Sequence, residues 1–194
     1  MSKNIESSYK KNNFDNIFKE ICEQVNPRSI LEIGILDGYS LKAFADYSSK
    51  DSDIVAIDLF EDYEYKNSNF KFVKNLFSQY KNVDIKYGNF YEFHKTCDNF
   101  DIIHIDISND ADTYQYALNH YFPKTNKLLI LEGGSQERDN VEWMTRFNKP
   151  SINSFLKNLD GEYSFNVIEL FPSLTIFYKN IDKELKIVWK NYFY

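Results

Sequence analysis

Residues 29–38 read Ser-Ile-Leu-Glu-Ile-Gly-Ile-Leu-Asp-Gly, and this stretch decides the fold. Ile30, Leu31 and Ile33 form a short apolar run of the kind that is buried on both faces of a parallel sheet. Two glycines then predict a turn, and residues 39–45 have the apolar spacing of a helix. A strand, a glycine loop and a helix in this order favour a nucleotide-like ligand, because the glycine lets the ligand approach the backbone and the helix offers unpaired N–H groups.

The glycine spacing separates this loop from two common nucleotide sites. A phosphate-binding loop needs Gly-x-x-x-x-Gly-Lys-Ser/Thr, and the dinucleotide fingerprint needs Gly-x-Gly-x-x-Gly. The chain instead has Glu32-x-Gly34-x-x-x-Gly38, whose acidic residue would repel a pyrophosphate and attract a ligand ammonium group. In this motif the chain resembles the class I S-adenosylmethionine-dependent methyltransferases. A tight turn that binds nothing stays open as the simpler interpretation.

Length and composition predict one domain in a reducing compartment. The 194 residues are enough for a full hydrophobic core, with an N-terminal helix in 1–28, the core in 29–179 and an aromatic tail in 180–194. Two cysteines without metal-ligand spacing indicate packed thiols, and the formal net charge of −6 disfavours a nucleic-acid partner. No apolar run reaches membrane-spanning length, and the polar start does not resemble a signal peptide, so we expect a cytoplasmic protein.

Two further strands are expected to end in residues that suit a nucleoside. Residues 53–58 form a second buried strand ending in Asp58, with Leu59 next to it, close to the spacing at which an acidic residue meets ribose hydroxyls. The turn after a third strand carries Asn89 and Phe90. In the resembled family this turn contacts the adenine. A solvated strand-end carboxylate and an ordinary turn stay open as alternatives.

The fourth and fifth strands are expected to carry the acceptor side of the site. Residues 100–106, Phe-Asp-Ile-Ile-His-Ile-Asp, resemble the corresponding strand of methyltransferases that modify sugars, macrolides and catechols. Asp106 would emerge where open α/β folds bind ligands, and Glu132 ends the fifth strand. Either carboxylate could act as a general base if burial and mutual repulsion raise its pKa. His104 is more typical of a hydrogen-bonded core residue.

The sequence leaves metal use open. Relatives that bind a divalent metal continue after the aspartate with glycine and histidine, where this chain has Ile107-Ser108-Asn109. They also place two adjacent carboxylates after the fifth strand, where Glu132 matches the first and Gly133 cannot match the second. Asp106 and Glu132 could still hold Mg²⁺ with waters, so the metal ligands stay unassigned.

The segment 132–146 is a candidate acceptor site. It contains two of the three arginines of the chain, Arg138 and Arg146, together with Trp143. Arginine suits forked recognition of phosphate or carboxylate, and an aromatic ring packs on sugar faces, so the composition fits a sugar with an anionic group. The alternative is a surface helix in which the arginines pair with neighbouring acidic residues, namely Glu137, Asp139 and Glu142.

The two ends of the chain each leave two interpretations. Apolar residues of 14–25 have helical spacing and predict a core-packing helix, whose start could instead form a partial lid over the cofactor cleft. Residues 163–170 and 173–179 read as a final pair of strands, with the last strand antiparallel to the others, as the resemblance implies. The aromatic tail 181–194 either packs on the domain or docks a partner subunit, so a homo-oligomer stays open.

The sequence therefore predicts a Rossmann-like, doubly wound α/β domain, with a mostly parallel sheet, an antiparallel last strand and helices on both faces. The resemblance implies methyl transfer from S-adenosylmethionine to an oxygen of a small molecule such as a sugar or glycan precursor. Glu32 and Gly34 would hold the methionine end of the cofactor, and Gly38 and Asp106 are also expected among the cofactor-binding residues. We expect no nucleic-acid or membrane partner. The alternatives are a non-catalytic interaction domain of the same shape and, less favoured, an NAD-binding oxidoreductase.

Overall fold

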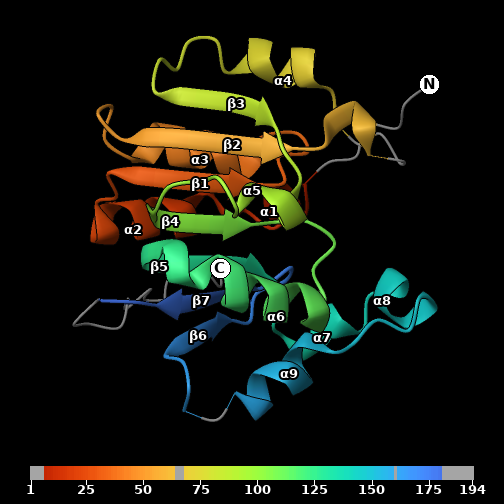
Figure 1. The fold of residues 1–194 in the computed structure, drawn as a ribbon. Coiled ribbons are helices and arrows are strands. Elements are labelled where there is room, and N and C mark those ends of the chain that lie inside the picture. Colours follow the sequence, from red (N-terminus) through yellow and green to blue (C-terminus); the bar gives the residue numbers. More distant parts are fainter. Residues whose placement is uncertain (1–6, 64–67, 160, 181–194) are drawn as a thin grey trace.

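The computed structural model describes residues 7–63, 68–159 and 161–180. Within them, seven strands form one sheet in the order β3-β2-β1-β4-β5-β7-β6, with β3 and β6 at its edges (Figure 1). The strands are β1 (Ser29–Ile33), β2 (Asp53–Asp58), β3 (Val83–Tyr87), β4 (Phe100–Ile105), β5 (Thr125–Glu132), β6 (Phe165–Ile168) and β7 (Leu174–Tyr178).

Strands β1 to β5 are parallel, and β7 runs antiparallel to both β5 and β6. The predicted class, a Rossmann-like mostly parallel sheet with an antiparallel last strand, is confirmed. The strand order reverses between β1 and β4, and their register pairs Ile30 with Ile102 and Ile33 with Ile105. In open α/β sheets such a reversal opens a ligand crevice at the carboxyl ends of the strands.

Helices cover both faces of the sheet (Figure 1). Side chains alternate along each strand, so Ile30 packs with the helices on one face and Leu31 with those on the other. The first face carries α1 (Ser8–Lys11), α2 (Asp15–Val25), α3 (Tyr39–Tyr47) and α4 (Phe70–Leu76). The second face carries α5 (Phe90–Phe93), α6 (Ala111–His120) and α9 (Ile152–Asn158).

Helix α2 confirms the amphipathic pattern read from the sequence. Its apolar residues Ile17, Phe18 and Ile21 are buried, and the Phe18 ring meets the Phe44 ring of α3 at 5.2 Å between centroids. The helix ends at Asn26, whose left-handed backbone directs the chain into β1. Packing of α2 and α3 together thus fixes the face on which the glycine loop opens.

Two connections between strands contain short elements. Among the described residues between β2 and β3 are the 3₁₀ turn η1 (Phe60–Asp62) and the helix α4. The segment after β5 folds into two short helices, α7 (Gln136–Asp139) and α8 (Glu142–Arg146). A further 3₁₀ turn, η2 (Phe122–Lys124), precedes β5. The aromatic tail lies outside the described residues. No helix in the described part of the chain is long and apolar enough to cross a membrane.

Candidate active site

The glycine loop after β1 lies directly against the end of β4. Gly34 has a φ of +89°, its N–H donates to the Ile57 carbonyl at 2.9 Å, and Asp106 N–H donates to the Ile33 carbonyl at 2.8 Å. A Cβ atom at position 34 would lie 1.9 Å from the Asp106 carbonyl oxygen. Only glycine permits this approach, which brings the loop and Asp106 together.

The carboxylate of Asp58 holds the same loop from the neighbouring strand. Its Oδ2 accepts from the N–H of Ile35 at 2.7 Å and of Leu36 at 3.5 Å, and its Oδ1 accepts from Phe60 N–H at 2.7 Å. A carboxylate has about four lone-pair sites, so roughly one acceptor site stays free. Asp58 therefore fastens the loop and can still accept one ligand hydroxyl.

A pocket of about 510 Å³ opens at this edge of the sheet. Six of the predicted cofactor residues line it, namely Gly34, Asp58, Leu59, Asn89, Phe90 and Asp106. Glu32 and Gly38 do not line it. The Oδ1 of Asn89 caps α5 by accepting from Tyr91 N–H at 2.9 Å, so its amide nitrogen is the group free for a ligand.

Other lining residues carried no signal in the sequence. Phe60, Tyr63 and Ser68 come from the segment after β2, and Ser108 follows Asp106. They line the pocket because two loops pass beside it, and the spacing of residues in the sequence does not predict the path of those loops. Phe60 and Tyr63 add aromatic rings to the pocket lining, and the two serines add hydroxyl groups.

Glu32 is fully buried on the face covered by α1, α2 and α3. Its carboxylate accepts from the Ser40 hydroxyl at 2.5 Å and contacts His104 Nδ1 at 2.7 Å, and His104 Nε2 lies 3.3 Å from the Tyr9 hydroxyl. Burial alone would lower the pKa of His104, but the carboxylates around it, Glu32 foremost, raise it above its usual value. The structure therefore makes Glu32 part of a buried polar network, and His104 is a hydrogen-bonded core residue as expected.

Asp106 and Glu132 come together at the adjacent ends of β4 and β5. The register pairs Ile105 with Leu131, which places the two acidic residues next to each other. Burial and the Glu132 carboxylate raise the pKa of Asp106 to about 8. Asp106 lines the pocket, so a carboxylate with a raised pKa borders the space in which a ligand would bind.

The three residues predicted to bind the acceptor, Arg138, Trp143 and Arg146, differ in their burial and in the groups that they contact. Arg138 is buried and forms a two-pronged ion pair with Glu132, through Nε at 2.5 Å and Nη2 at 2.9 Å. The alternative pairing of Arg138 with its sequence neighbours in 137–142 is therefore wrong. Trp143 lies against Arg138, at 5.2 Å from its guanidinium carbon, whereas Arg146 is exposed and lies over the Phe147 ring at 5.5 Å.

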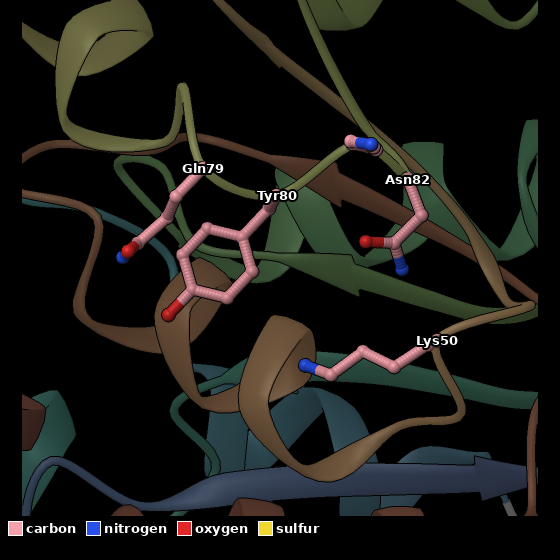
Figure 2. Close-up of a pocket in the computed structure, with 5 residues that line it drawn as sticks. Lys50, Gln79, Tyr80 and Asn82 are labelled. Atoms are coloured by element: carbon pink, nitrogen blue, oxygen red, sulfur yellow. The ribbon is translucent and has the colours of Figure 1, made fainter.

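A second hollow, of about 460 Å³, is lined by residues that precede β2 and β3, and Figure 2 shows four of them, Lys50, Gln79, Tyr80 and Asn82. Lys50 and Asn82 border it beside the Tyr80 ring. Lys50 Nζ donates to the Ala45 carbonyl at 3.2 Å, Asn82 donates to the Ser52 carbonyl at 2.8 Å, and the Tyr80 hydroxyl donates to Asp46 at 2.6 Å. These three hydrogen bonds join the loops that border the hollow.

The comparisons with known proteins agree with this geometry. A model of the O-methyltransferase family matches residues 2–158, so the chain belongs to that family. The prediction of an S-adenosylmethionine-dependent O-methyltransferase is confirmed. No curated protein sequence matches the chain significantly.

Solved structures with the same fold include three bacterial proteins. A Bacillus cereus O-methyltransferase in complex with S-adenosylhomocysteine has 15% identity and a TM-score of 0.63, with 89% of this chain and 82% of that chain covered. A Klebsiella pneumoniae protein assigned as an O-methyltransferase has 15% identity and a TM-score of 0.65, covering 87% and 80%. A Staphylococcus aureus protein assigned as a caffeoyl-CoA O-methyltransferase has 21% identity and a TM-score of 0.61, covering 86% and 83%.

Proposed function

We propose that the 510 Å³ pocket binds S-adenosylmethionine and that the chain transfers its methyl group to an oxygen of a small-molecule acceptor. The observation that carries this proposal is the convergence of Gly34, Asp58 and Asp106 on one pocket at the point where the strand order reverses. The similar Bacillus cereus structure contains S-adenosylhomocysteine, the product of such a transfer.

The lining residues suggest how the cofactor lies. Asp58 accepts a ribose hydroxyl with its remaining lone pair, while Leu59, Asn89 and Phe90 receive the adenine. The methionine end then lies beside Gly34, and the methyl group is directed toward Asp106 at the end of β4.

Two of the predicted cofactor residues act behind this surface. Gly38 begins α3, and Glu32 accepts a hydrogen bond from Ser40 in the first turn of that helix. In this proposal they fix the helix start near the methionine end of the cofactor without lining the pocket.

The reaction needs alignment and one proton acceptor. The acceptor oxygen bonds to the methyl carbon as the carbon–sulfur bond breaks, and the bonding electrons go to sulfur, which gives S-adenosylhomocysteine. The hydroxyl proton passes to the Asp106 carboxylate, whose raised pKa suits a general base near neutral pH. Glu132 contributes through its charge, because it raises the pKa of Asp106.

We further propose that the acceptor is a sugar or glycan precursor with an anionic group. Arg146 is exposed on α8, near the half-exposed Trp143, so a guanidinium and an aromatic face are available beyond the end of β5. The net charge of −6 does not favour a nucleic-acid acceptor. Two buried free thiols, Cys22 and Cys97, support the cytoplasmic setting expected from the sequence.

Calorimetric titration with S-adenosylhomocysteine tests the cofactor assignment. We expect binding by the wild type, and a dissociation constant at least tenfold higher in Asp58→Asn, because that change weakens both the loop contacts and the ribose contact. Asp53→Asn is the matched control, since Asp53 is the exposed aspartate at the other end of β2. No binding by the wild type at millimolar ligand would overturn the proposal.

A further inference from the structure

A buried ion pair between Glu132 and Arg138 lies at the carboxyl end of β5. Glu132 is 4% exposed and Arg138 is 5% exposed, and both carboxylate oxygens accept from the guanidinium. The Trp143 ring lies against the same guanidinium at 5.2 Å, which adds a cation–π contact. The arginine is therefore held rigidly from two sides.

One nitrogen of Arg138 is left over. Its Nη1 is buried and has no hydrogen-bond partner among the residues that the structure describes. A buried donor without a partner costs free energy, roughly 1–3 kcal/mol and more for a charged group. Arg138 does not line the 510 Å³ pocket, so its charge, which lowers the pKa of Asp106, acts on the site without direct contact with a ligand.

The same ion pair stands where metal-using relatives, in the pattern described above, would carry their carboxylates. Mg²⁺ needs oxygen ligands in near-octahedral geometry. Both oxygens of Glu132 are already bonded to Arg138, and Gly133 offers no side chain. A Cβ atom at position 133 would lie 2.7 Å from Ile152 Cδ1, so the position has no room for a carboxylate without local movement.

The remaining candidate ligands do not complete a set of oxygen ligands for a divalent metal. The Asn109 side-chain nitrogen donates to the Ile105 and Glu132 carbonyls, both at 3.0 Å, and its buried Oδ1, which has no partner among the described residues, adds a single neutral oxygen. Across residues 7–63, 68–159 and 161–180, no group of three or more His, Cys, Asp and Glu residues could hold a metal ion. The residues present therefore do not fit a divalent cation.

We propose that Arg138 is the permanent cation beside Asp106 and Glu132, and that methyl transfer by this chain needs no divalent metal. The proposal rests on the proposed methyltransferase activity and states which group supplies the positive charge at that site. The guanidinium supplies the positive charge beside Asp106 and Glu132 that a bound metal would otherwise supply. It also prevents the two carboxylates from capturing a metal.

Titration with MnCl₂, followed by electron paramagnetic resonance of the full chain, tests the exclusion of metal without any substrate. We expect no one-to-one Mn²⁺ site in the wild type. In Arg138→Gln the Mn²⁺ affinity should rise at least tenfold, because Glu132 and Asp106 lose the charge that neutralises them. Arg28→Gln is the matched control, since it removes an exposed arginine that precedes β1. It should leave Mn²⁺ binding unchanged.

A second variant separates the effect of losing the Arg138 charge from the effect of a failure to fold. Arg138→Lys keeps a positive charge and should bind Mn²⁺ as weakly as the wild type.

Three results would overturn the proposal: a stoichiometric Mn²⁺ site in the wild type, no gain of Mn²⁺ affinity in folded Arg138→Gln, or methyl transfer that EDTA abolishes and Mn²⁺ restores. Titration with S-adenosylhomocysteine in EDTA separates this inference from the proposed function. Failure to bind contradicts the methyltransferase site, whereas the Mn²⁺ result decides the role of Arg138.

Discussion

At the scale of single residues, Asp106 connects the fold to the proposed chemistry. It follows β4, lines the pocket, and has a pKa of about 8 because of burial and the neighbouring Glu132 carboxylate. His104 and Arg138 oppose this shift with positive charge, while Glu32 on β1 adds to it. The carboxylate thus ionises within the range in which an enzyme works.

This residue predicts a pH dependence of the reaction. Only the ionised carboxylate accepts a proton, so kcat/KM should rise about tenfold per pH unit below pH 8 and level off above it. Asp106→Asn should lose roughly 10²- to 10⁴-fold in rate and this pH dependence. Initial rates between pH 6 and 9.5 check the prediction, and a flat wild-type profile would contradict it.

The same shift predicts a stability effect that needs no substrate. Because the pKa of Asp106 is higher in the folded chain than the ordinary value of about 3.9, its contribution to folding is present at low pH and is lost as the pH rises toward 8. The stability of the wild type relative to Asp106→Asn should fall between about pH 4 and 8. Urea unfolding at several pH values measures this difference.

At the scale of elements, the close contact of the β1 loop with the end of β4 is the feature most sensitive to change. Gly34→Ala puts a Cβ atom into the Asp106 carbonyl and also strains a positive φ, so we expect a loss of more than about 2 kcal/mol in the free energy of unfolding. Gly161→Ala is the control, because Gly161 has a φ of +79° with nothing within 4 Å of the added atom. Equal losses in both variants would show that the close approach is unimportant.

The elements also show what the sequence could predict. Buried runs such as 53–58 specify strands almost to the residue, because burial on both faces of a parallel sheet leaves a continuous apolar signal. The direction of a single polar side chain at a strand end is different. Glu32 lies on the face of Ile30, where it meets His104 from a strand that is 72 positions away, and no local pattern encodes that partner.

The segment after β5 was harder to predict for a similar reason. Arg138 could have paired with acidic neighbours on its own helix, yet the turn through Gly133 and Gly134 brings it back onto Glu132. Only the three-dimensional path of that turn distinguishes a surface arginine from a buried one. The composition of the segment therefore indicated recognition chemistry, but the sequence did not identify the partner.

At the scale of the whole molecule, the pocket is assembled from segments that follow four strands. β1 supplies the glycine loop, β2 supplies Asp58, β3 leads to Asn89, and β4 leads to Asp106. The hydrophobic layers on both faces pack against these strands and so support their ends. A ligand that contacts all four ends binds only the folded chain, so its binding free energy adds to the stability of the entire sheet.

This coupling gives a prediction that separates the two enzyme classes considered from the sequence. S-adenosylhomocysteine at 100 times its Kd should stabilise the folded chain by about 2.7 kcal/mol and raise Tm by roughly 5–10 °C for a domain of this size. NAD at the same concentration should leave Tm unchanged, because the loop lacks the third glycine of the dinucleotide fingerprint and Glu32 lies next to it. Differential scanning fluorimetry measures both shifts, with Asp58→Asn as the variant in which the first shift shrinks. Stabilisation by NAD alone would favour the oxidoreductase class, because the ligand that stabilises the sheet is the ligand that its strand ends recognise.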